Sequence, residues 1–388
     1  MEKFTEFSDR IDSFEKTFDL GQEDFRPNPS VLAKVDENNR FKPFYGDTTV
    51  FVLSEEEQAY FKTFTDMLYQ EVPECFSERI DSKTFHMTLH DLSNSPVLAD
   101  VQHQMSINEG KLRNLMKEQI LPCSRIAMTV NAVFNLNHTA LVVGLKATGS
   151  NYSKLMQMYE MLNEIQPLPY PFTPHITLAY YNRNGFSAES GRRLTEIVNT
   201  LNQKRYWFPL DTQQLFYQHF ENMAGYQNIF CLDMNREQRE KNYHDIVLSM
   251  MKEAGWSETR KIDISEQLAY LKKEQYAVSD SQMAFLENFN GLQIPIHVKR
   301  YGDMLENIRY VTCDCEEWLI PKKWLSLFNY QNYAESPLVP FGFIEGEDTV
   351  LMIDEQLRIY GVWEYGISLM GDSIFDVLLK FYADEPII

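Results

Sequence analysis

The sequence of 388 residues lacks any apolar run near the roughly 20 residues that a membrane-spanning helix needs. Its start, MEKFTEFSDR, is charged and lacks the basic-then-apolar order of a secretion signal. The five cysteines are an odd number, and Cys313 and Cys315 are too close for an ordinary disulfide and outside zinc-knuckle spacing. We therefore expect a cytoplasmic protein with no membrane segment and unremarkable thiols.

Positive charge is scarce, and several catalytic motifs are missing. The chain holds 36 Lys and Arg against 56 Asp and Glu, a net charge of −20. This balance repels duplex nucleic acid, so we expect no duplex DNA partner. There is no phosphate-binding glycine loop, no G-x-S-x-G and no HExxH, which excludes P-loop, α/β-hydrolase and zincin-type sites.

The hydrophobic content of 44% is ample for packed cores, and the length suggests two or three domains. Residues 1–30 read as an irregular lead-in. Strand and helix patterns then alternate over residues 31–234, which predicts a sheet-rich α+β domain. A charged helix marks the start of a second, smaller α+β domain over residues 235–388. The second part is the more acidic, because residues 241–388 hold 24 acidic and 13 basic side chains, a balance of −11.

A duplicated tetrapeptide is the informative feature of the first part. HMTL begins at residue 86 and HITL at residue 175, 89 residues later, and each follows a long helical pattern. Successive side chains on a strand point to opposite faces, so His86 and Thr88 share one face and His175 and Thr177 share one face. If the two copies pack about a pseudo-twofold axis, two imidazoles and two hydroxyls converge on one cavity.

These four groups suffice for phosphodiester cleavage without a metal or cofactor. A neutral imidazole, with an unperturbed pKa of ~6.5, accepts a proton from water or a hydroxyl, and a protonated one donates to the leaving oxygen. Threonine hydroxyls donate to the non-bridging oxygens. We therefore predict His86 and His175 as catalytic and Thr88 and Thr177 as phosphate-binding, with the acid and base roles left open. A single His-x-Thr is the ordinary solvent face of a strand, so the duplication carries the prediction.

Several neighbours of the two motifs could contact a substrate. They are His90, Tyr180, Tyr181, Arg183, Tyr226 and Lys83. His90 falls on the face of His86 if the strand continues, and would then form the rim of the cavity; a metal pair there lacks a third and fourth ligand. The tyrosines could stack on a nucleotide and the two cations could contact phosphate. Packing or a solvated position is the alternative for each.

The first part resembles a known superfamily. The spacing of the motifs, the segment FTPHITLAYY with its preceding prolines, and the strand order resemble the 2H phosphoesterases, which include the LigT-like RNA ligase/cyclic phosphodiesterases, over roughly residues 40–234. The segment KVDENNRFKPFYGDTTVFVL is similar to a bacterial branch of that group. The resemblance implies a bilobal pseudo-twofold α+β fold, both motifs in a central cleft, and metal-free action on 2′,3′-cyclic phosphates or related RNA ends.

The second part resembles another superfamily. AGW followed by Arg and IDI, FLENFNGLQI, and the PFGF…LMIDEQLRIYG run are similar to the SUKH (SMI1/KNR4-type) proteins, most closely the third subfamily of immunity proteins. The resemblance implies a non-catalytic domain that binds and neutralises toxins, often nucleases. The acidic balance fits a basic toxin bound by residues 240–388.

Two functions follow from these patterns. The first is an enzyme that cleaves RNA ends or cyclic nucleotides and is fused to a toxin-binding domain. The alternative is a non-enzymatic immunity protein in which the 2H-like domain is accessory. The two are compatible, because one chain could block a nuclease and process its products.

Overall fold

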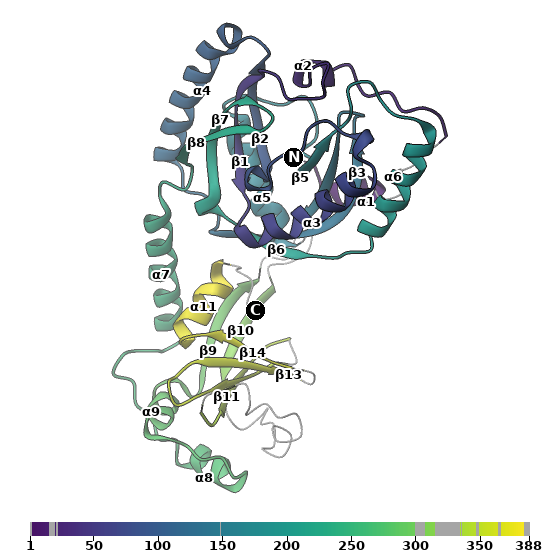
Figure 1. Ribbon diagram of the computed structural model, residues 1–388. Helices are drawn as coiled ribbons and strands as arrows, with labels where there is room; N and C mark the ends of the chain where they lie inside the picture. Colours follow the sequence, from purple (N-terminus) through teal and green to yellow (C-terminus); the bar gives the residue numbers. More distant parts are fainter. Residues whose placement is uncertain are drawn as a thin grey trace. The chain divides into compact units, whose positions relative to one another are not determined.

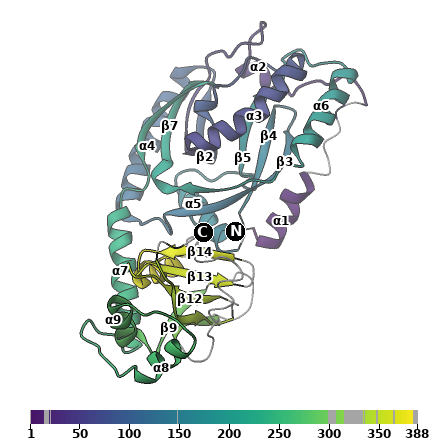
Figure 2. The same cartoon turned by 60° about the horizontal axis from the view of Figure 1, so that its bottom comes forward.

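The computed structural model describes residues 2–14, 20, 22–147, 149–298, 307–314, 334, 336–346, 349–363 and 366–383. The chain divides into two compact units, Met1–Arg236 and Glu237–Ile388. Each has its own sheet and hydrophobic core (Figures 1 and 2). Both units combine helices with an antiparallel sheet, which confirms the predicted α+β class. No helix in the described part of the chain is long and apolar enough to cross a bilayer.

The first unit is built on one eight-stranded antiparallel sheet with the order β6-β3-β4-β5-β2-β1-β7-β8. Its strands are β1 (Tyr45–Val52), β2 (His86–Ser95), β3 (Arg125–Leu136), β4 (Ala140–Ala147), β5 (His175–Tyr180), β6 (Trp207–Asp211), β7 (Leu215–Asn222) and β8 (Gly225–Cys231). The order places four strands on each side of the junction between β5 and β2. This arrangement fits the bilobal fold that the resemblance implied.

Six α-helices and three short 3-10 helices accompany this sheet in the described residues. The α-helices are α1 (Phe4–Ser13), α2 (Val31–Lys34), α3 (Glu55–Glu71), α4 (Leu98–Glu118), α5 (Ser150–Asn163) and α6 (Ala188–Leu201). The 3-10 helices are η2 (Pro73–Cys75), η3 (Ser82–Thr84) and η4 (Thr212–Gln214). The helix α3 precedes β2 and α5 precedes β5, so the helix-then-motif order is duplicated in the fold.

Local sequence explains where α3 begins, but it did not predict the helix α1. Ser54 accepts from the amide of Glu57 at 3.4 Å, and the carboxylate of Glu57 accepts from the amide of Ser54 at 2.8 Å, so a capping box starts the helix. The lead-in expected to be irregular contains α1, because Phe7 and Ile11 lie one turn apart and are fully buried.

The second unit carries a six-stranded antiparallel sheet in its described residues, with the order β14-β13-β12-β11-β10-β9. Its strands are β9 (Leu292–Val298), β10 (Asn307–Cys313), β11 (Val339–Ile344), β12 (Val350–Ile353), β13 (Ile359–Trp363) and β14 (Gly366–Gly371). Its helices are α7 (Arg236–Glu253), which begins one residue before the unit, α8 (Ser265–Lys273), α9 (Asp280–Phe289) and α11 (Ile374–Ala383). Cys315 lies outside the described residues.

The sequence motifs of the second unit hold its loops together. The guanidinium of Arg260 donates to the carbonyls of Asn288 at 2.5 Å and Asn290 at 2.8 Å, which ties the AGW–Arg segment to the end of α9. The carboxylate of Asp354 is fully buried and pairs with Arg358 at 2.7 Å inside the LMIDEQLRIYG run. Buried polar groups of this kind must be hydrogen-bonded, so these motifs stabilise the fold.

Candidate active site

Strands β2 and β5 meet at the centre of the first sheet, and the two His-x-Thr motifs lie there. Met87 pairs with Ile176 in an antiparallel register. Both side chains are fully buried. They therefore anchor the two strands in the core on one face of the sheet, and the polar residues on either side of them emerge on the other face.

The pairing of Met87 with Ile176 sets the positions of the four polar residues. In an antiparallel register, the residues before and after that pair place His86 opposite Thr177 and Thr88 opposite His175. All four line one cavity of about 520 Å³. The structure thus brings the four predicted residues together with local twofold symmetry.

Each imidazole is held in the same way. Nδ1 of His86 donates to the carbonyl of Thr84 at 2.7 Å, and Nδ1 of His175 donates to the carbonyl of Thr173 at 2.7 Å. A carbonyl only accepts, so Nδ1 carries the hydrogen in both rings. Nε2 is left to accept or donate a proton on the cavity side, and the ring orientation is fixed by the backbone.

Burial lowers the pKa of both histidines below the usual value of 6.5. The imidazole of His175 lowers the pKa of His86 as well, and the ammonium of Lys34 lowers the pKa of His175. The carbonyl acceptors and the carboxylate of Asp91 raise both pKa values, and burial outweighs them. The cavity thus holds three groups that can carry positive charge, His86, His175 and Lys34, together with the carboxylate of Asp91.

The lowered pKa values predict an acidic pH optimum. The base histidine must be neutral and the acid histidine protonated. Because both pKa values lie below ~6.5, kcat/KM for a phosphodiester substrate should reach its maximum below that pH and fall on either side of the maximum. We expect a bell-shaped profile with its maximum below pH 6.5, measured as kcat/KM between about pH 5 and about pH 8. A maximum above neutrality contradicts this account.

Lys34 belongs to the site and was missed from the sequence. It ends the four-residue helix α2, is half-buried and lines the cavity. Its ammonium lies 5.1 Å from the ring centroid of Tyr180 and 5.3 Å from that of Phe44, and burial lowers its pKa. No motif marks this residue, because only the folded chain brings α2 beside the two central strands.

Two of the predicted tyrosines line the cavity. The ring of Tyr226 packs against His86 with 4.7 Å between centroids. Tyr180 is buried, and its hydroxyl donates to the sulfur of Met223 at 3.0 Å. Burial raises the pKa of both tyrosines, so their hydroxyls are neutral hydrogen-bonding groups at neutral pH.

The predicted rim position of His90 is wrong. A β-bulge inserts Leu89 between the pairs Val50–Thr88 and Thr49–His90, so the alternation of faces is broken. His90 is 1% exposed and does not line the cavity. Its Nε2 meets the side-chain oxygen of Asn163 at 3.0 Å, on α5. His90 therefore belongs to the packing between β2 and α5.

The other three predicted contacts are also outside the cavity lining. Tyr181 is fully buried among aromatic rings, including Phe25 with 4.6 Å between centroids. The guanidinium of Arg183 donates to the carbonyl of Val35 at 3.1 Å. Lys83 lies exposed in η3. Core packing explains Tyr181, loop anchoring explains Arg183, and Lys83 has a solvated position.

The candidate metal ligands are the described His, Cys, Asp and Glu side chains. No group of three or more His, Cys, Asp or Glu that could hold a metal ion occurs in the part of the chain that the structure describes.

Comparisons with known proteins found similar proteins for both units. Residues 243–383 match the family model of the SUKH-3 immunity protein. No curated protein matches the chain. The resemblance of the second part to the third SUKH subfamily is confirmed.

Solved structures are similar to the other part of the chain. A conserved protein of unknown function, ATU0111 from Agrobacterium tumefaciens str. C58, is 16% identical, with 54% of this chain and 94% of that chain covered and a TM-score of 0.43. E. coli LigT in its apo form is 16% identical over 48% of this chain and 95% of that chain, with a TM-score of 0.31. The MHV ns2 PDE domain is 13% identical over 48% and 97%, with a TM-score of 0.26. LigT is the protein after which the LigT-like group of the sequence resemblance is named.

Proposed function

We propose that the first unit is a metal-independent phosphodiesterase that acts on 2′,3′-cyclic phosphates or related RNA or nucleotide phosphodiester ends. The observation that carries the proposal is the symmetric placement of the two imidazoles. Both Nδ1 atoms are bound to backbone carbonyls, both rings line one cavity, and each ring faces the threonine of the other motif. E. coli LigT, which is similar in structure, has been solved with 3′-AMP and with phosphate.

The proposed reaction needs only these groups. The neutral histidine takes a proton from water as its oxygen bonds to phosphorus. The bond from phosphorus to one ribose oxygen breaks, and the protonated histidine gives its proton to that oxygen. The products are a phosphomonoester and a free hydroxyl. The hydroxyls of Thr88 and Thr177 donate to the non-bridging oxygens, where negative charge develops. The assignment of acid and base between His86 and His175 stays open.

Among the described residues, Lys34 is the one Lys or Arg side chain that lines the cavity of this proposed site. It shares the cavity with the carboxylate of Asp91, which raises the pKa of Lys34 against the larger lowering by burial. Lys34→Met should therefore raise KM for a cyclic phosphate and the inhibition constant of inorganic phosphate about tenfold, as expected for one lost charged hydrogen bond. Lys83→Met is the matched control, because Lys83 is exposed near the first motif and does not line the cavity. Equal effects in the two variants contradict the role of Lys34.

The proposed activity is tested with the full chain in EDTA. A panel of 2′,3′-cyclic nucleotides and cyclic-phosphate-ended oligoribonucleotides is offered, and the products are separated by chromatography. We expect ring opening to a single phosphomonoester isomer. If no substrate of the panel is cleaved, the result contradicts the phosphodiesterase function and favours the binding function described next.

A second proposed function belongs to the other unit: it binds and neutralises a toxin. The match of residues 243–383 to the SUKH-3 immunity protein favours it, and the balance of −11 over residues 241–388 suits a basic nuclease. We expect the full chain carrying both His86→Ala and His175→Ala to form a stoichiometric complex with the toxin encoded beside its gene and to inhibit it. Loss of inhibition in this variant shows that protection depends on the phosphodiesterase site.

A further inference from the structure

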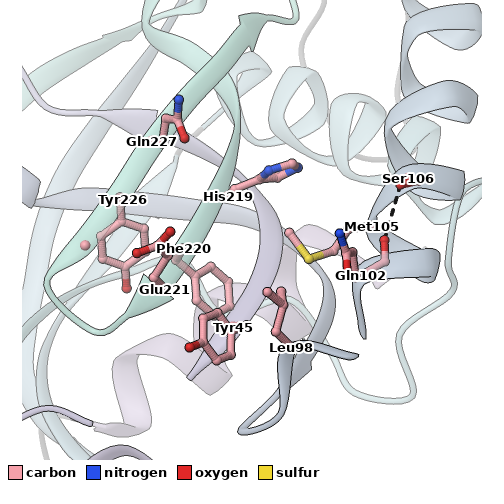
Figure 3. A pocket seen from close by; sticks show the side chains of 11 residues that line it. Tyr45, Leu98, Gln102, Met105, Ser106, His219, Phe220, Glu221, Tyr226 and Gln227 are labelled. Carbon is pink, nitrogen blue, oxygen red and sulfur yellow. Dashed lines mark hydrogen bonds between the residues drawn. The ribbon is translucent and has the colours of Figure 1, made fainter. Parts of the chain in front are cut away.

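A second cavity of about 510 Å³ lies between α4 and the β7–β8 hairpin (Figure 3). The helix α4 supplies four lining residues that recur at helical spacing on one face: Leu98, Gln102, Met105 and Ser106. The hairpin and its neighbour β1 supply the opposite wall, with Tyr45, His219, Phe220, Glu221, Tyr226 and Gln227. Neither the two motifs nor the proposed reaction uses this cavity.

The hydrogen bonds below the cavity place a hydrogen on Nε2 of His219. The carboxylate of Asp47 is 1% exposed, and the hydroxyl of Tyr217 donates to it at 2.8 Å. That acceptor is charged and closer than the carbonyl of Met105, at 3.1 Å, so it takes the hydroxyl hydrogen. The oxygen of Tyr217 then accepts from Nε2 of His219 at 3.1 Å. With its hydrogen on Nε2, a neutral His219 presents Nδ1 as an acceptor.

The lining excludes some ligands and favours others. No Lys or Arg lines the cavity, and Glu221 is its one acidic side chain. A phosphate in the cavity is therefore disfavoured. The acceptor nitrogen of His219, the carboxylate of Glu221 and two side-chain amides suit a neutral ring that carries N–H donors. The rings of Tyr45, Phe220 and Tyr226 provide surfaces for stacking, and a nucleobase has both properties.

The second cavity adjoins the one between the histidines. Phe220 and Tyr226 line both, and the ring of Tyr226 lies 4.7 Å from that of His86. We propose that the second cavity binds the base of the nucleotide next to the one whose phosphate lies between the histidines. This inference rests on the proposed phosphodiesterase function and makes the substrate an oligonucleotide end rather than a mononucleotide.

The test compares a cyclic-phosphate-ended dinucleotide with the matching 2′,3′-cyclic mononucleotide on the full chain. We expect kcat/KM for the dinucleotide to be about tenfold higher, within the contribution of one stacked base. The ratio should fall toward one in His219→Ala and in Ser106→Trp, which blocks the cavity from an exposed position on α4. His103→Ala, exposed on the same helix and outside the lining, should keep the ratio. A ratio near one in the unaltered protein, or one that survives both variants, overturns the proposal.

A binding measurement separates this inference from the proposed activity. A dinucleotide and a mononucleotide, each ending in a 3′-phosphate, are titrated into the full chain by calorimetry. In one outcome, the protein shows no turnover and yet binds the dinucleotide about tenfold more tightly, with the difference lost in His219→Ala. That result supports the base site and contradicts the phosphodiesterase function. Turnover without any dinucleotide advantage in rate or binding leaves the phosphodiesterase and removes the base site.

Discussion

Substitution of either His86 or His175 by alanine lowers kcat for a 2′,3′-cyclic nucleotide by about 100- to 10,000-fold. Each ring supplies one of the two proton transfers, and the backbone carbonyl at its Nδ1 already fixes its orientation. Because the two act in one concerted exchange, the double variant should lose little more than the worse single variant. Steady-state kinetics on the three variants measures this.

The control for these variants is His103→Ala. His103 is exposed on α4 and lines neither cavity, so we expect its kcat to equal that of the unaltered protein. Full activity in either His86→Ala or His175→Ala, with the protein folded, removes that histidine from the mechanism. Multiplied losses in the double variant show that the two rings act independently.

Substitution of Asp47 by alanine lowers the free energy of unfolding of the first unit by about 3 kcal/mol. The buried carboxylate accepts from the amide of Ser93 at 2.9 Å, the side chain of Asn108 at 3.0 Å and the hydroxyl of Tyr217 at 2.8 Å. Alanine leaves these buried donors without their acceptor. Tyr217 can turn to the carbonyl of Met105 at 3.1 Å, which limits the loss. Urea unfolding followed by circular dichroism measures the change.

Asp9→Ala is the matched control for this prediction. Asp9 is an exposed carboxylate in the same unit, and substitution of such a residue changes stability by no more than about 0.5 kcal/mol. A cost for Asp47→Ala that is as small as this shows that water replaces the lost acceptor. In that case the hydrogen-bond chain from Asp47 to His219 contributes little to the fold.

The central site was predictable because its signal is local. Alternation along a strand puts His86 and Thr88 on one face without knowledge of the partner strand. The misplacement of His90 has the opposite cause, since the bulge at Leu89 is defined only by how β2 pairs with β1. Lys34 reaches the site through tertiary packing from a helix of four residues, which no pattern in the sequence marks.

In the second unit, the family resemblance predicted more than the periodicity of the sequence did. The segments that carried the resemblance hold buried polar contacts, such as those of Arg260 with the carbonyls of Asn288 and Asn290 and of Asp354 with Arg358. The contacts of Arg260 join residues 28 and 30 positions apart in the chain, so spacing alone cannot predict them. These residues explain internal contacts of the second unit.

The central claim is that the two imidazoles hold one phosphate between them. A crystal structure of the full chain with a nucleoside 3′-monophosphate tests this most directly. We expect oxygens of that phosphate within about 3 Å of Nε2 of both His86 and His175, with the hydroxyls of Thr88 and Thr177 on its other oxygens. A phosphate bound away from the two rings, or rings that turn Nδ1 toward it, contradicts the account.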